Sequence, residues 1–125
     1  MARMVKVLSN QPMHIHPNLR IFVSGQEVAV PANIGIAPNL WKDHSMDKYI
    51  GDMGAAPIHT HDSSGTLHVE SSVTARYTLG NFLKIWGLNL KGHSVSVNAD
   101  GHTYKRPSSV PLKDHEQIEL HIDET

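Results

Sequence analysis

The sequence predicts an α+β fold, and within that class a β-grasp-like arrangement in which a mixed sheet is crossed by one main helix. Three observations lead to this prediction. Short β-rich runs alternate with Gly-containing turns, one segment alone has clear helical periodicity, and the elements follow in the order hairpin, insertion, helix, hairpin, strand. The chain has the length of one domain, so we expect residues 1–125 to form a single unit.

The N-terminal half contains two predicted hairpins. After a mixed leader (residues 1–12), two β-rich runs separated by a Ser-Gly-Gln turn predict a hairpin over residues 19–30. Residues 32–56 carry glycines and prolines without sustained periodicity, which predicts a long irregular insertion with one helical turn near residues 43–49. In residues 57–71, alternation on both sides of an Asp-Ser-Ser-Gly turn predicts a second, histidine-rich hairpin.

The C-terminal half contains the predicted helix, a third hairpin and a final strand. Apolar residues recur with helical spacing in residues 78–87, where Thr78 is a suitable N-cap and Gly87 a suitable stop. A β-rich run then leads to Asp100-Gly101, a dipeptide typical of type I′ hairpin turns. In residues 117–122 every second residue from Ile118 on is Ile or Leu, which predicts a strand with one face in the core.

The composition excludes several classes of function. The chain has 11 Lys and Arg against 12 Asp and Glu, so it lacks the basic excess of a nucleic-acid-binding protein. It contains no apolar run of the length of a membrane span, and it has no cysteine, which excludes disulfides and thiolate metal ligands. Because no signal peptide begins the sequence as given, we expect a cytoplasmic protein, or an extracytoplasmic one if its N-terminus was trimmed.

Histidine is the unusual component, since the chain contains ten of them. Four occur as two His-x-His pairs, His14 with His16 and His59 with His61. In an extended strand, residues i and i+2 lie on the same face about 6.6–7 Å apart, so each pair can direct two imidazoles at one metal ion. Pro17 favours extended geometry at His16. One such pair is a weak signal, whereas two together favour a metal site.

The predicted histidine-rich hairpin adds a third histidine and a carboxylate to the second pair. A four-residue turn would pair His61 with Thr66 and His59 with His68. His68 and Glu70 then share the hairpin face that carries the two histidines. We expect His68 and Glu70 to support the metal ligands, by holding their rings or by relaying protons.

The other residues with ligand chemistry have simpler explanations. Asp62 can support a ring nitrogen of His61 as an acceptor or can start the turn, and we favour the turn. The remaining five histidines are expected to be solvated surface residues, of which only His44 is a candidate extra ligand. They are His44, His93, His102, His115 and His121.

The ligand chemistry leaves three types of metal site open. Four imidazoles in a tetragonal arrangement suit Cu(II), and three with an open water position suit catalytic zinc. Two histidines and one carboxylate, which His59, His61 and Glu70 can supply, suit non-haem iron. Copper has the highest intrinsic affinity for such ligands, so a histidine-rich site has the capacity to bind it.

Several segments resemble a family of small, largely uncharacterised archaeal and bacterial proteins that share HxH, HTHDxxGxxHxE and LGxFxxxWG motifs. The resemblance covers roughly residues 13–122, and it implies a metal site, with copper as the ion, at His14, His16, His59 and His61. Some relatives have a cysteine before the HTHD segment, and this chain has none. The segments are Met13-His-Ile-His-Pro-Asn-Leu, Ile34-Gly-Ile, His59-Thr-His-Asp-Ser-Ser-Gly-Thr-Leu-His-Val-Glu-Ser and Leu79-Gly-Asn-Phe-Leu-Lys-Ile-Trp-Gly.

Together these observations predict a small metalloprotein with a mononuclear all-histidine copper site and a redox or copper-handling role. A zinc-dependent lyase or hydrolase, with three histidines and an open water position, is the first alternative. A β-grasp interaction module with a pH-sensitive histidine cluster and no metal is the second. Whether the protein is an enzyme stays open, as does a site shared between subunits of a homo-oligomer, since His14 lies near a chain terminus.

Overall fold

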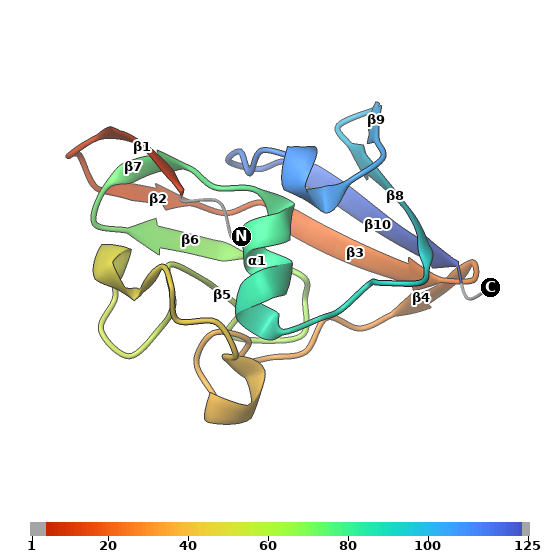
Figure 1. Ribbon diagram of the computed structural model, residues 1–125, viewed down its shortest axis with the longest axis horizontal. Helices are drawn as coiled ribbons and strands as arrows, with labels where there is room; N and C mark the ends of the chain where they lie inside the picture. Colours follow the sequence, from red (N-terminus) through yellow and green to blue (C-terminus); the bar gives the residue numbers. More distant parts are fainter. Residues whose placement is uncertain (1–4, 124–125) are drawn as a thin grey trace.

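A computed structural model describes residues 5–123 of the chain. Within these residues the fold is α+β, as predicted, with ten strands in three sheets and one α-helix (Figure 1). The two larger sheets follow one another along the long axis of the molecule, and the helix lies between them in this view (Figure 1).

The largest sheet has five strands in the order β4-β3-β10-β8-β9. β3 (Asn18–Val23) and β4 (Gln26–Val28) form the first predicted hairpin, and β8 (Ser94–Ala99) and β9 (His102–Tyr104) form the third. β10 (Gln117–Asp123) lies in the centre, parallel to β3 and antiparallel to β8, which makes the sheet mixed. The sequence signals for these hairpins and for the last strand are therefore confirmed.

The third hairpin turns, and helix α1 begins and ends, at the residues that the sequence predicted. The Asp100-Gly101 turn has positive φ at both residues, 49° and 87°, as a type I′ turn requires. Helix α1 (Leu79–Trp86) is capped by Thr78, whose hydroxyl accepts from the N–H of Asn81, while the Asn81 side chain accepts from the N–H of Thr78. Gly87 ends the helix in the left-handed conformation, with φ of 89°.

The buried apolar residues of the sheets and the helix form one core cluster. Phe82 of α1 is fully buried in it, and the turn η3 (Pro107–Ser109) packs against the same helix so closely that a Cβ on Gly80 would lie 2.9 Å from Ser108. The three-stranded sheet buries only one face in this core, which leaves its other face available for polar side chains. The fully buried core residues of that sheet are Ile58 and Val69.

The three-stranded sheet has the order β2-β6-β5 and holds the histidines of interest. β6 (His68–Ser71) pairs in antiparallel fashion with β2 (Met13–Ile15) on one side and with β5 (Ile58–His59) on the other. β5 and β6 form the predicted histidine-rich hairpin, and His59 is the partner of His68, as predicted.

The second expected pair of that hairpin is not formed. Beyond β5 the chain turns away from β6, because the N–H of Thr60 donates to the carbonyl of Ile34 in the insertion (3.0 Å). Thr66 bridges to Asn18. The prediction that His61 pairs with Thr66 is therefore wrong, since hydrogen bonds to the insertion replace the expected ladder.

Two stretches for which no strand was predicted contain regular structure. The leader includes β1 (Lys6–Ser9), which pairs with β7 (Thr74–Arg76), and the sequence analysis predicted neither strand. Residues 1–4 of the leader lie outside the described residues. The insertion contains two short 3-10 turns, η1 (Pro38–Leu40) and η2 (Asp47–Tyr49), the second within the stretch where a helical turn was predicted.

Candidate metal centre

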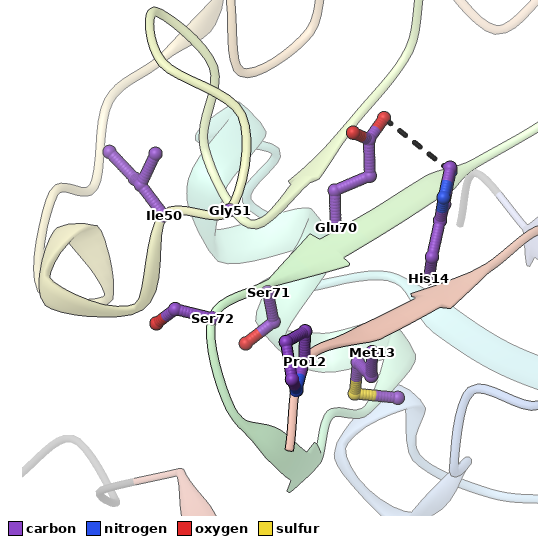
Figure 2. A pocket seen from close by; sticks show the side chains of 8 residues that line it. All are labelled: Pro12, Met13, His14, Ile50, Gly51, Glu70, Ser71 and Ser72. Carbon is purple, nitrogen blue, oxygen red and sulfur yellow. Dashed lines mark ion pairs between the residues drawn. The ribbon is translucent and has the colours of Figure 1, made fainter. Parts of the chain in front are cut away.

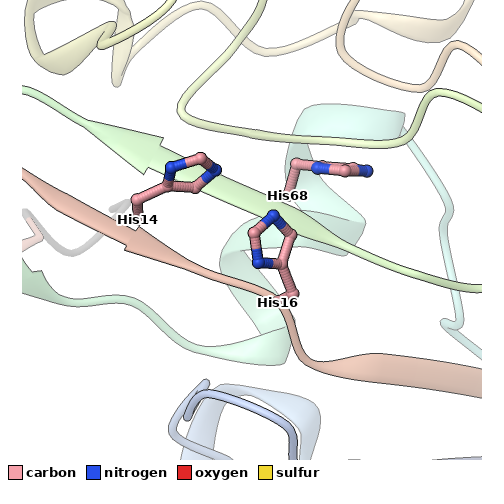
Figure 3. Close-up of side chains that lie close together, drawn as sticks. All are labelled: His14, His16 and His68. Atoms are coloured by element: carbon pink, nitrogen blue, oxygen red, sulfur yellow. The ribbon is translucent and has the colours of Figure 1, made fainter.

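One face of the three-stranded sheet carries five histidines and a glutamate close together. In the register of this sheet His14 is the partner of Glu70, and His68 is the partner of His59. His16 follows His14 by two residues and joins the same face, and Figure 3 shows both of their rings beside that of His68. We call the set the His/Glu cluster: His14, His16, His59, His61, His68 and Glu70.

The rings of the cluster contact one another in a continuous series. The ring centroids of His14 and His16 lie 4.6 Å apart, and those of His16 and His68 lie 4.9 Å apart. His68 lies 4.4 Å from His61, which lies 4.8 Å from His59. The contacts that link the two His-x-His pairs run through His68, because β6 lies between β2 and β5.

Glu70 lies between His14 and His59, the two ends of this series. Its Oε1 lies 3.4 Å from Nε2 of His59 and 3.8 Å from Nε2 of His14. Within residues 5–123, these two histidines are its only ion-pair partners, and no Lys or Arg pairs with it. Its side chain is 21% exposed, and a carboxylate so placed with no Lys or Arg beside it attracts a cation.

The ligating atoms of the cluster fall into two groups of three. Within each group, all three atoms lie within 4.8 Å of one another. A single ion bound at about 2.0–2.2 Å places opposite ligands at most about 4.4 Å apart, so each group has about the size of one coordination sphere. The His14 group is His14, His16 and His68, and the His59 group is His59, His61 and Glu70.

The structure brings all four ligands predicted from the sequence into the cluster, but it places the two His-x-His pairs in different groups. The third member of each group is a residue that we expected to support the ligands, His68 in the first and Glu70 in the second. The signal that could have found them was present, because both residues lie on the predicted hairpin face. The set His59, His61 and Glu70 is the one that the sequence offered for non-haem iron. The role of His68 as a ligand beside His14 and His16 depends on the position of β2, which the sequence did not indicate.

His59 has the most informative environment of the six residues. Its side chain is fully buried, and its Nδ1 lies 2.8 Å from the carbonyl oxygen of Ala56. Because a carbonyl only accepts, Nδ1 carries the proton and Nε2 keeps a lone pair. Nε2 is buried and has no hydrogen-bond partner among the described residues. Metal-ligating histidines characteristically donate their second nitrogen to a carbonyl in this way.

The surroundings of His59 and His68 favour the neutral imidazole, which is the form that binds metal. Burial lowers the pKa of His59 below its ordinary value. Burial likewise lowers the pKa of His68, and the neighbouring rings of His61, His16 and His59 lower it further, because adjacent imidazoles resist being charged together.

The insertion fixes the buried side of the cluster. The hydroxyl of Thr60, between the two histidines of the second pair, donates to the carbonyl of Pro31 (2.8 Å) and accepts from the N–H of Ile34 (3.0 Å). Gly35 has a φ of 76°, and a Cβ on it would lie 2.8 Å from the carbonyl oxygen of Ile58. Glycine therefore allows the insertion to pack directly against β5.

The loop that precedes β10 fixes the opposite side. The N–H of His16 donates to Oδ1 of Asp114 (2.8 Å), and the N–H of His115 donates to the carbonyl of His16 (3.2 Å). The backbone of His16 is thus held from a segment almost 100 residues away in the sequence, at a separation of 98. Both ends of the cluster are positioned by long-range contacts.

A pocket of about 370 Å³ lies beside the cluster and shares His14 and Glu70 with it (Figure 2). One wall comes from the insertion, where the N–H of Gly51 donates to the carbonyl of Glu70 (3.2 Å). A small molecule in this pocket would contact a residue of each ligand group. The lining residues are Pro12, Met13, His14, Ile50, Gly51, Glu70, Ser71 and Ser72.

The other candidates from the sequence lie outside both groups. The carboxylate of Asp62 accepts from the N–H (3.0 Å) and hydroxyl (2.6 Å) of Ser64, as expected for a turn residue. His44 contacts Asp47 through Nδ1 (2.8 Å) and stacks on Trp41. Of the remaining histidines outside the cluster, His121 is half-buried, and His93, His102 and His115 are exposed.

Comparisons with known proteins add no relative: no family model matches the chain, and no curated protein or solved structure matches it. No helix within residues 5–123 is long and apolar enough to cross a membrane. The functional conclusion therefore follows from the geometry of the cluster.

Proposed function

We propose that the His/Glu cluster binds a transition-metal ion and that the protein is a small metalloprotein. The observation that carries this proposal is the buried Nε2 of His59, which has no hydrogen-bond partner among the described residues. Leaving such an atom unpaired in the interior costs free energy, and a metal ion bound to its lone pair removes that cost. The remaining imidazoles and the Glu70 carboxylate supply further ligands.

We propose copper as the first ion and zinc as the second. Imidazole suits both ions, and copper binds such sites most tightly among the divalent first-row metals. The mononuclear four-histidine site expected from the sequence would draw its ligands from both groups. The grouping of the atoms instead supports three protein ligands for one ion, with an open coordination position.

An open position beside a pocket supports a reaction at the metal as the role of the site. With zinc, a bound water made acidic by the ion would serve hydrolysis or a lyase reaction, and with copper the same position would serve a redox reaction. The pocket of about 370 Å³ offers room for a small substrate next to His14 and Glu70. Copper handling without catalysis is the second candidate function. The exposure of His14 and His61 favours it, because ligands that solvent can reach allow a bound ion to exchange.

We also propose the β-grasp assignment for the five-stranded sheet. The order β4-β3-β10-β8-β9, with its parallel central pair, supports it, and so does the position of α1 in the chain between the two hairpins. Under this assignment, the histidine-bearing sheet is an addition built from residues before the first hairpin and from the histidine-rich hairpin that follows the insertion.

Equilibrium uptake of copper and zinc by untagged, metal-free protein tests the metalloprotein proposal. We expect uptake at micromolar or lower ion concentrations, and an EPR signal with nitrogen ligands for the copper form. Glu70→Gln keeps the size of the side chain and should weaken binding, whereas Glu119→Gln, the same change on a strand of the other sheet, should not. No uptake, or equal loss in both variants, would contradict the proposal and favour an interaction module.

A further inference from the structure

We propose that the His/Glu cluster is a dinuclear centre, in which Glu70 bridges two divalent first-row transition-metal ions such as Zn²⁺ or Cu²⁺. This inference rests on the proposed function and adds to it a second ion and a bridging ligand. The sequence alone indicated one ion.

The first argument is the number and spacing of the ligands. The cluster offers six ligand atoms, and they divide into two groups of three, each within 4.8 Å. Three protein ligands with one open position are a common set for one catalytic ion, and the size of each group fits bonds of about 2.0–2.2 Å. The two groups are in contact, since the rings of His68 and His61 lie 4.4 Å apart across their border.

The second argument is the position of Glu70 at the same border. It belongs to the His59 group, with Oε1 3.4 Å from Nε2 of His59, and yet the same oxygen lies 3.8 Å from Nε2 of His14 in the other group. A carboxylate has two oxygens and about four lone-pair sites, so it can bind one ion through each oxygen.

The third argument is electrostatic. Five of the six ligands are imidazoles, which bind a metal ion in their uncharged form. Two neighbouring dications repel each other, and a negative charge between them reduces the repulsion. Glu70 is the only carboxylate in the two groups, and it contacts both, which places the negative charge where a pair of ions needs it.

Native mass spectrometry of the full chain, titrated from the metal-free form with Zn²⁺ and then separately with Cu²⁺, tests this inference. We expect two ions per chain. His14→Ala and His61→Ala change exposed residues, one in each group, so the fold is retained and each variant should keep one ion. His102→Ala removes an exposed histidine outside the cluster and should keep two.

The variant Glu70→Gln distinguishes a Glu70 that bridges two ions from a Glu70 that binds only one. A bridge predicts that both binding steps weaken by at least about tenfold, because loss of even a residue that only supports a ligand costs about 10–100-fold in affinity. One step left unchanged would overturn the bridge. One ion in the wild type, lost in both histidine variants, would overturn the dinuclear centre but leave a mononuclear site. No ion at all would instead overturn the proposed function.

Discussion

The two larger sheets each carry a face with histidine and glutamate, and they differ in how the charged groups are partnered. On the five-stranded sheet, Arg20 donates through two nitrogens to Glu27 (2.9 Å each) and lies 3.7 Å from Glu119. Glu119 also contacts Nε2 of His121 (3.0 Å), and the His121 ring stacks on Phe22. Every charged group in this set has a partner.

On the three-stranded sheet the carboxylate has only histidines as ion-pair partners among the described residues. Within residues 5–123, Glu70 pairs with no Lys or Arg, and the buried Nε2 of His59 has no hydrogen-bond partner. The comparison shows that a histidine beside a glutamate does not by itself distinguish the two faces, since both have one. What distinguishes them is the presence of converging ligand atoms that the protein itself leaves unsatisfied.

The largest difference between the two sheets should appear in metal affinity. His59→Ala removes the buried ligand and should weaken binding by more than about 100-fold, beyond the range seen for residues that only support a ligand. His121→Ala, on the five-stranded sheet, should bind like the wild type. Competition with a chelator of known affinity measures both. Similar losses in the two variants would remove the distinction between the sheets.

Metal should stabilise the fold through the three-stranded sheet. A ligand that binds only the folded state adds about 2.7 kcal/mol at a free concentration of 100 times its dissociation constant. We expect a gain of this size in the free energy of unfolding, measured by urea titration with buffered zinc. At the same zinc concentration, Glu70→Gln should lose about half of the gain if its affinity falls tenfold, and more if it falls further, whereas Glu119→Gln should keep the whole gain. A gain of wild-type size in Glu70→Gln would contradict the site.

Acid should destabilise the metal-free protein through the same sheet. The pKa values of His59 and His68 lie below the ordinary value of 6.5, chiefly because of burial. Unfolding restores ordinary values, so the unfolded chain binds more protons as the pH falls. Stability is therefore fully present above about pH 6.5 and is lost as the pH falls toward the folded pKa values. Urea titrations over this range measure the slope.

The histidine variants sharpen this acid test. In metal-free His59→Ala and His68→Ala, stability should fall less steeply with pH than in the wild type, because each removes one of the two groups that bind extra protons on unfolding. If the free energy of unfolding depended on pH in both variants as it does in the wild type, the acid sensitivity would arise elsewhere.

The smallest effect is expected on the five-stranded sheet. Arg20→Ala breaks an exposed ion pair with Glu27, which high dielectric and salt already weaken. It should lower stability only slightly, by an amount that shrinks with added salt, and it should not alter metal binding. A loss of metal affinity in Arg20→Ala would mean that the two faces are coupled.

Elements with local signals were predictable from the sequence. Helix α1 begins after Thr78 and ends at Gly87 as expected, and the turn before β6 set the pairing of His59 with His68. These signals act within a few residues, where capping and turn geometry decide the structure. The strands β1 and β7 have no comparable local signal, and they were missed.

The arrangement of the site depended on contacts that no local pattern encodes. The pairing of His14 with Glu70 joins residues that are distant in the sequence, and it decides that Glu70 faces both groups. Hydrogen bonds of Thr60 to the insertion prevented the expected pairing of His61. The sequence could therefore predict the ligand types and the set His59, His61 and Glu70, but not that His68 joins His14 and His16 in a second group.

A crystal structure of the metal-loaded protein, with anomalous diffraction measured at the absorption edge of the added ion, tests the central claim most directly. We predict anomalous density within the His/Glu cluster, with Nε2 of His59 bonded to an ion and Nδ1 still donating to Ala56. Density confined to exposed histidines such as His93 or His102, with Nε2 of His59 unbound, would contradict the account.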